Sequence, residues 1–125
     1  MSKSAQDFLS EANSVVPSIA VEEALSLINS GKAVVIDVRD GKDIDQSGTV
    51  KNALRIPRGM IEFVADPTTS FYNDQISNDK EILVICGAGG MASLTGKTLI
   101  EMGYTNVHNV GGFSAWKDAG GPTED

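Results

Sequence analysis

The stretch EILVICGAGGMASLTGKTLIEMGY, residues 81–104, joins an apolar run to a glycine-rich turn and a segment with helical spacing. The run from Ile82 to Ile85 is continuously apolar, which is typical of a strand buried on both faces. The turn begins at Cys86, the single cysteine of the chain. Apolar residues recur at helical spacing from Ala92 to Met102. The stretch therefore predicts a strand, a tight turn carrying a thiol, and a helix.

The same alternation extends in both directions along the chain. Strands are predicted at 33–39, 53–57, 82–85 and 106–110, and helices at 8–16, 21–28, 43–47, 59–65, 92–102 and 113–117. Strands that alternate with helices predict an α/β fold, a parallel sheet covered by helices on both faces. Ligands of such sheets bind at the carboxyl ends of the strands, where Asp37 to Arg39, Arg58 and Cys86 are predicted to lie.

Length and composition indicate one globular domain. The chain has 125 residues, 22% charged and 41% hydrophobic, without repeats or low-complexity tracts. We expect an N-terminal helix within residues 1–16, a core at 17–120 and a tail at 121–125. The net charge of −7 argues against nucleic acid or an anionic membrane as partner.

Two further features bear on location and metal binding. There is no run of about 18 apolar residues and no signal-peptide core at the N-terminus, so we expect a cytoplasmic protein. One cysteine and one histidine are too few for a structural zinc site, so no metal is expected. The cysteine is then either a small buried hydrophobe or a functional thiol.

The turn after Cys86 also fits a dinucleotide-binding pattern. Residues 87–92, GAGGMA, match G-x-G-x-x-G/A between a strand and a helix. That site needs an acidic residue about 20 positions later for the ribose hydroxyls, where the chain has His108 and Asn109. Only one further strand–helix unit follows. The pattern therefore gives weak support for a nucleotide cofactor, and none is expected.

A phosphate-binding P-loop is suggested by Gly96-Lys97-Thr98 but fails on geometry. The motif requires glycine five residues before Gly96, and Met91 stands there. Lys97 also lies well inside the predicted helix, too far from its N-terminus to reach a phosphate. We interpret Lys97 as part of a solvated helix face.

A nucleophilic Cys86 accounts for both the cysteine and the glycines. A thiol at the end of a strand, followed by small residues, can sit in a ring of inward-pointing backbone amides. These amides and the dipole of the following helix stabilise negative charge on the sulfur. Glycine permits so tight a turn because it accepts positive φ.

Four segments in this order resemble the rhodanese-like family over nearly the whole chain. VVIDVRD, residues 34–40, resembles its Asp-Val-Arg strand, and SGTVKNALRIP, residues 47–57, its Gly-Ala-x-x-Ile-Pro segment. ICGAGGMAS, residues 85–93, resembles the active-site loop, and residues 102–122 resemble the C-terminal signature.

The resemblance implies a sulfurtransferase that needs no cofactor and acts on a small sulfur-containing substrate such as thiosulfate. Cys86 would carry the sulfur as a persulfide and pass it to a thiophilic acceptor such as a protein thiol. The substrate-binding residues would be the loop amides and the nearest cation: Gly87, Ala88, Gly89, Gly90, Met91, Ala92 and Arg58. The alternative is a rhodanese-like module that binds a protein partner or carries a persulfide without turnover.

The loop departs from the family at one position that bears on chemistry. Met91 replaces an arginine or lysine often found there, which weakens the case for the thiosulfate dianion as donor. Met91 either lines the pocket or packs into the core. Phosphatase relatives have a loop one residue longer that ends in arginine, whereas this chain has Ala92 there. A phosphate ester would therefore lack a guanidinium partner.

The neighbouring polar and aromatic residues receive more modest roles. Asp37 and Arg39 are expected to fix the surrounding loops by hydrogen bonds, and Arg58 can pair with Glu62 on the next helical turn. Thr49 stands where the family often has a histidine, and Asn52 where it has a glycine. We interpret that histidine and that glycine as structural residues of the family. Residues of the last strand and helix are expected to pack or to end a strand: His108, Phe113 and Trp116.

Overall fold

A computed structural model describes residues 2–125 and has a parallel four-stranded sheet at its centre. The strands are β1 (Ala33–Asp37), β3 (Leu54–Arg55), β4 (Glu81–Cys86) and β5 (Val107–Gly112). Their order is β3-β1-β4-β5, and each neighbouring pair is parallel. The predicted α/β fold with a parallel sheet is thus confirmed. β4, which carries Cys86, is central.

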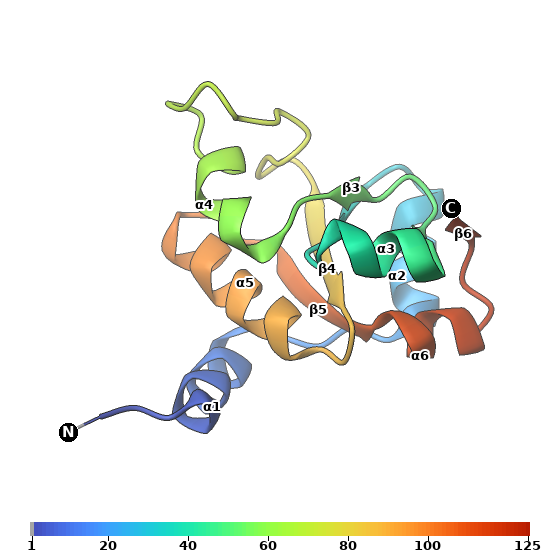
Figure 1. Ribbon diagram of the computed structural model, residues 1–125. Helices are drawn as coiled ribbons and strands as arrows, with labels where there is room; N and C mark the ends of the chain where they lie inside the picture. The colour runs from blue at the N-terminus through green and yellow to red at the C-terminus, as the bar shows by residue number, and fades with distance from the viewer. Residues whose placement is uncertain (1) are drawn as a thin grey trace.

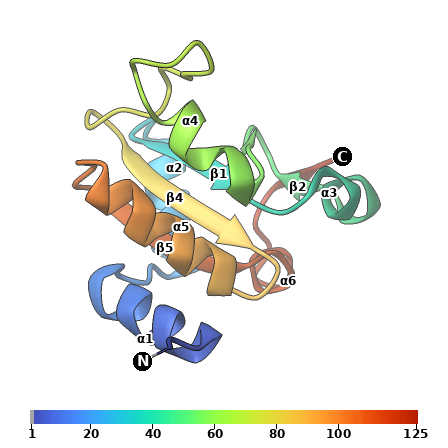
Figure 2. The ribbon, with the colours of Figure 1, turned by 60° about the vertical axis from the view of Figure 1, so that its left-hand side comes forward.

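Helices cover both faces of this sheet (Figures 1 and 2). They are α1 (Ala5–Val15), α2 (Val21–Asn29), α3 (Gly41–Ser47), α4 (Ile61–Val64), α5 (Gly90–Glu101) and α6 (Phe113–Asp118), with a 3₁₀ turn at Arg58–Met60. One core cluster joins the sheet to α4 and α5, and the other joins it to α2 and α6. α1 packs on the outer side of α5.

The side chains of β4 explain why this strand forms the centre. Ile82 and Val84 belong to the cluster under α4 and α5, whereas Leu83 and Ile85 belong to the opposite cluster. All four are fully buried. Successive strand residues point to opposite faces, so a strand covered on both sides must be apolar throughout. Cys86 follows the same alternation and joins the cluster under α4 and α5.

Several element boundaries differ from the predicted ranges, and two of these differences bear on the surroundings of Cys86. α5 begins at Gly90 rather than Ala92 because Gly89, with φ +99°, turns the chain directly into the helix. β5 continues to Gly112, beyond the predicted end at Val110. Its register with β4 shifts between Val84 and Ile85, so that the strand bulges and reaches the level of Cys86.

A second, two-stranded antiparallel sheet was not predicted. β2 (Thr49–Val50) pairs with β6 (Thr123–Glu124). The segment 121–125, expected as a tail, therefore ends in a strand. The Trp116 indole N–H donates to the Pro122 carbonyl over 3.0 Å and holds this strand against α6.

Candidate active site around Cys86

Cys86 is the last residue of β4 and lies at the carboxyl edge of the sheet. Its side chain is 2% exposed, and residues 87–89 carry the chain over it into α5. The two neighbouring strands, β1 and β5, also end at this edge. The fold thus places the thiol where ligands of parallel α/β sheets bind.

Two backbone amides donate to the cysteine sulfur. The Gly89 N–H lies 3.0 Å from Sγ, and the Ala92 N–H lies 3.3 Å from it. Ala92 is in the first turn of the 12-residue helix α5, whose N-terminus points its partial positive charge toward the sulfur. Donors and dipole together stabilise negative charge on Sγ or on an atom bound to it.

Two glycines make this tight geometry possible. Gly89 adopts φ +99°, a conformation that L side chains rarely adopt. Gly112, at the end of β5, lies directly against the loop, since a Cβ there would come within 2.4 Å of the Gly87 carbonyl oxygen. Sequence reasoning missed Gly112 as part of the site. The signal was the Gly111-Gly112 pair directly after a predicted strand.

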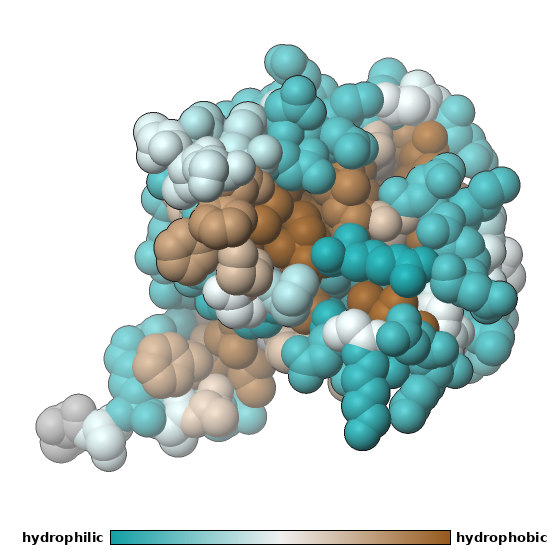
Figure 3. All heavy atoms as spheres, turned by 45° about the horizontal axis from the view of Figure 1, so that its top comes forward, coloured by the Kyte–Doolittle hydropathy of each residue, from teal (hydrophilic) through white to brown (hydrophobic). Residues whose placement is uncertain are grey.

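Met91 lies outside the core at the surface. Its side chain is 38% exposed and lines a cavity of about 660 Å³ between α1 and α5, together with Gly90, Leu9 and Arg58. In Figure 3, hydrophobic atoms are exposed on α1, at the lower left, and also in a recess of the larger part of the molecule above it. Met91 therefore does not pack into the core, and the cavity that it lines is bordered by α1 and α5 rather than by Cys86.

Arg58 lies in the same cavity, but its guanidinium is already bonded. Nη1 pairs with Glu62 over 3.3 Å, as the i, i+4 spacing predicts, and Nη2 donates to Thr98 Oγ1 over 3.0 Å. The other cation of the cavity, Lys97, pairs with Glu101 over 2.6 Å. That hydrogen bond and the Glu101 charge raise the pKa of Lys97. Both cations are therefore paired with carboxylates.

A buried ion pair supports the edge of the sheet beside Cys86. Arg39 donates to Asp37 through Nε and Nη2, the latter over 2.8 Å, and also to the Gly48 carbonyl and Ser47 Oγ. Thr49 donates to the same Asp37 carboxylate over 2.7 Å. The expected mutual bonding of Asp37 and Arg39 is present, and the network ties β1 to α3 and β2.

The remaining residues named from the sequence lie apart from the sulfur. His108 pairs with Glu81 over 3.0 Å and lies opposite Leu83, three residues before Cys86 on β4. Phe113 and Trp116 are buried in the cluster under α2 and α6. The Phe113 ring also stacks on the Arg39 guanidinium, 4.6 Å from its centroid.

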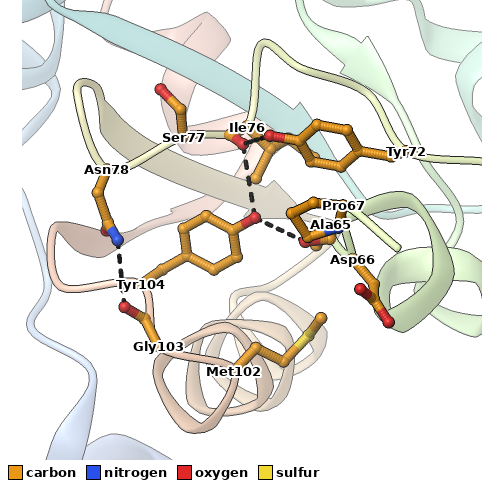
Figure 4. Close-up of a pocket in the computed structure, with 10 residues that line it drawn as sticks. All are labelled: Ala65, Asp66, Pro67, Tyr72, Ile76, Ser77, Asn78, Met102, Gly103 and Tyr104. Carbon is orange, nitrogen blue, oxygen red and sulfur yellow. Dashed lines mark hydrogen bonds between the residues drawn. The ribbon is translucent and has the colours of Figure 1, made fainter. Parts of the chain in front are cut away.

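A second cavity, of about 520 Å³, lies at the opposite edge of the sheet (Figure 4). Tyr104 precedes β5 there, and Ile76 precedes β4, so this cavity opens at the amino ends of the strands. The Tyr104 hydroxyl points between the Ala65 and Ile76 carbonyls and bonds to both. This cavity is therefore remote from Cys86.

Neither a membrane-spanning helix nor a metal-binding cluster occurs in the described part of the chain. Within residues 2–125, no helix is long and apolar enough to cross a membrane. Over the same residues, no three side chains of His, Cys, Asp or Glu are grouped so that they could hold a metal ion.

Comparisons with known proteins give a family and several relatives. The model of the rhodanese-like domain matches residues 20–119. Thiosulfate sulfurtransferase GlpE of Coxiella burnetii is 30% identical over 104 residues, 82% of this chain and 88% of that protein. Adenylyltransferase and sulfurtransferase UBA4 of Candida albicans is 34% identical over 91 residues, 72% of this chain but only 20% of that protein.

Among solved structures, the chain is similar to protein RPA3614 of Rhodopseudomonas palustris. The TM-score is 0.89 at 35% identity, covering 99% of this chain and 96% of the other. That protein is described as of unknown function and a possible tyrosine phosphatase. The likeness extends over α1, which lies outside the residues matched by the family model.

Proposed function

Because the chain belongs to the rhodanese-like family, we propose that it is a sulfurtransferase in which Cys86 carries sulfane sulfur as a persulfide. The observation that supports this most is the pair of amides on Sγ, from Gly89 at 3.0 Å and Ala92 at 3.3 Å. They stabilise the thiolate that must attack the donor, and they surround the place where the transferred sulfur arrives.

The reaction has two covalent steps. The Cys86 thiolate attacks the outer sulfur of the donor; with thiosulfate, the S–S bond breaks and sulfite leaves with its electron pair. This gives Cys86–S–S⁻. A nucleophile such as cyanide or a thiolate then attacks the outer sulfur, the S–S bond to Cys86 breaks, and the thiolate is restored. Charge and atoms balance in both steps, and no redox cofactor is needed.

The loop amides bind the terminal sulfur in this proposal. Those of Gly87 and Ala88 belong to exposed residues of the loop, and those of Gly90 and Met91 lie in the first turn of α5. The first amides of an α-helix have no partner within the helix, so they can donate to an anion at its N-terminus. The apolar cavity beside Met91 adds no unpaired charge. A donor that carries less charge than thiosulfate, such as an organic persulfide, suits it better.

The acceptor we propose is a thiol, either of a small molecule or of a protein. The name of the Candida albicans relative includes both an adenylyltransferase and a sulfurtransferase activity, and this chain spans only a fifth of that protein. A binding module without turnover is the competing function. Cys86 favours the transferase, because a binding surface needs neither a thiol nor amides aimed at it.

Phosphatase activity receives little support from this loop. The description of the Rhodopseudomonas palustris protein suggests that activity for that protein. Here the loop residues from Gly87 to Ala92 include no arginine, and the guanidinium of Arg58 is bonded to Glu62 and Thr98. A phosphate ester gains most from a bidentate guanidinium contact, which this loop does not offer.

Intact-protein mass spectrometry tests the proposal directly. After incubation with thiosulfate or an organic persulfide, the protein should gain the mass of one sulfur atom and lose it when cyanide is added, with thiocyanate released. Cys86→Ser should show neither change while its circular dichroism and melting temperature stay those of a folded protein. A folded wild-type chain that gains no sulfur from either donor would favour the binding module. Turnover of an aryl phosphate in the same preparation would favour the phosphatase.

A further inference from the structure

Asn109 of β5 makes hydrogen bonds with both atoms of its side-chain amide. Nδ2 donates to the Gly89 carbonyl oxygen over 3.0 Å, and Oδ1 accepts from the Gly111 N–H over 2.7 Å. One bond reaches across to the active-site loop, and the other stays within the bulge of β5.

The backbone of Asn109 is held as firmly as its side chain. Its N–H donates to the Pro17 carbonyl over 2.8 Å, and its carbonyl accepts from the Ile19 N–H over 3.1 Å. The segment that links α1 to α2 therefore adds a further parallel bridge beside β5. Asn109 presents its amide to the loop from a fixed position.

Gly89 is the loop residue whose orientation decides one of the two donors to the sulfur. Its N–H donates to Cys86 Sγ, while its carbonyl accepts from Asn109 and from the Ser93 N–H of α5. The other donor, Ala92, sits within α5 and is oriented by the helix itself. Gly89 has wide φ/ψ freedom, so the two bonds to its carbonyl restrict the direction of its N–H, and Asn109 supplies the one that comes from outside the loop and α5.

We propose that Asn109 is a positioning residue for the sulfur chemistry of Cys86, acting through the backbone of Gly89. The expected effect on the rate of sulfur transfer rests on the proposed function. The expected effect on the orientation of the Gly89 N–H does not. Nδ2 carries the positioning role, whereas Oδ1 carries the local turn with Gly111. Variants can therefore separate the two.

Two substitutions keep an acceptor for Gly111 and remove the donor to Gly89. Asn109→Asp retains a carboxylate oxygen in place of Oδ1 and sets the other oxygen against the Gly89 carbonyl. Asn109→Ser is neutral, still forms the local turn through its hydroxyl, and is too short to reach Gly89. Asn106→Asp is the matched control: it makes the same change next to the opposite end of β5, and no side-chain hydrogen bond of Asn106 occurs within residues 2–125.

The geometric readout is the amide ¹H–¹⁵N shift of Gly89 and Ala92 when Cys86 is alkylated with iodoacetamide. In the wild type and in Asn106→Asp, both amides should shift, because both donate to Sγ. In Asn109→Asp and Asn109→Ser, the Gly89 response should fall to less than about half, while the Ala92 response persists as an internal reference. An undiminished Gly89 response in both variants would overturn the proposal.

The kinetic readout is sulfur transfer to cyanide. Removing one preorganised donor costs about 10²–10³ in rate. Here the donor is loosened rather than removed, so kcat should fall about three- to thirty-fold with KM changed less than about twofold. A loss in Asn109→Asp alone would mean that the added charge, not the lost bond, is responsible, and would also overturn the proposal.

The two readouts fail separately. If the wild type transfers no sulfur, the proposed function fails, and the amide shifts still decide the role of Asn109. If the wild type transfers sulfur and both Asn109 variants match its kcat, only the positioning role is wrong. Melting temperatures confirm that each variant is folded, and Asn109→Ser alone carries the test if the aspartate variant does not fold.

Discussion

At the level of single residues, the proposed sulfurtransferase function leads us to expect that Met91 influences how the site treats an anionic donor. It occupies the second position of α5, is 38% exposed, and shares its cavity with Arg58. The substitution Met91→Arg would place a guanidinium at the end of the loop, where the side chain borders a cavity. A hydrogen bond to a charged group contributes about 1.5–3 kcal/mol, and screening at the surface reduces this. We expect about a three- to thirty-fold gain in kcat/KM for thiosulfate.

Three comparisons make this prediction specific. The gain should shrink with added salt, because salt screens the attraction between the guanidinium and thiosulfate. It should be much smaller for an uncharged persulfide donor, which lacks the negative charge that the guanidinium attracts. Met91→Leu, which conserves volume and polarity, should show no gain. A folded Met91→Arg with thiosulfate turnover equal to or below wild type would contradict the idea. In that case Arg58 would be the next cation to test, by the substitution Arg58→Ala.

The sequence predicted the position of Cys86 in the fold better than the surroundings of Met91. Cys86 and its glycines follow from a strand, a thiol and a tight turn, all local in the chain. The environment of Met91 depends on α1, some 80 residues away, and no local pattern reveals that packing. Asn52, noted as a substitution for glycine, has φ +66°, which asparagine tolerates better than most residues.

At the level of elements, the end of β5 supports the loop by close backbone contact. A Cβ at Gly112 would lie 2.4 Å from the Gly87 carbonyl oxygen and 3.2 Å from Ala88 Cα. Both are backbone atoms, so the loop itself must move. Gly112→Ala should lower the free energy of unfolding by about 1–3 kcal/mol and reduce sulfur transfer at least tenfold.

Gly41→Ala is the matched control, since Gly41 begins α3 and a Cβ added there would have no atom within 4 Å. That variant should retain wild-type transfer and be slightly more stable, because alanine is the better helix former. Denaturant titration and the cyanide assay measure both effects. Equal activity of Gly112→Ala and wild type would mean that the loop tolerates a shift against β5.

The elements that escaped prediction share a physical cause. β2 and β6 have two residues each, too few for a period-2 pattern, and their paired residues lie 75 (Thr49 and Glu124) and 73 (Val50 and Thr123) positions apart in the sequence. The early start of α5 depends on the left-handed conformation of Gly89, which lets the helix begin before its apolar spacing does. Long, apolar, locally patterned segments such as β4 were predictable for the opposite reason.

At the level of the whole molecule, the fold followed from alternation alone, whereas the long connection from α4 to β4 did not. Residues 65–80 contain no helix or strand. Tyr104 holds this connection from the far side of the sheet, donating to the Ala65 carbonyl over 2.6 Å. Tyr72, within the connection, donates to the Ile76 carbonyl over 3.0 Å. These two hydroxyls add to scattered turn bonds of the connection, such as the Asn73 N–H to the Val64 carbonyl, and no regular sequence pattern indicates them.

Tyr104→Phe should therefore destabilise the protein without touching the site. The ring stays in place, but the Ala65 carbonyl loses its buried donor. We expect a loss of about 1–2 kcal/mol in the free energy of unfolding at neutral pH. Sulfur transfer by the folded variant should equal that of the wild type, because Tyr104 lies at the amino edge of the sheet and Cys86 at the carboxyl edge.

The same substitution should change how stability depends on alkaline pH. Tyr104 is 8% exposed, and burial raises its pKa above the ordinary 10.0, with the Tyr72 and Asp66 charges adding to the effect. The unfolded tyrosine ionises near its ordinary pKa while the folded hydroxyl keeps its proton. The wild type therefore holds its full advantage over Tyr104→Phe below about pH 10 and loses it as pH rises through the folded pKa.

Denaturant titrations of both proteins between about pH 8 and pH 11 measure this difference in the free energy of unfolding, and the contributions of groups common to both proteins cancel. A gap that stays constant across that range would show that Tyr104 ionises as easily in the folded protein as in the unfolded chain, and that its hydroxyl does not hold the connection.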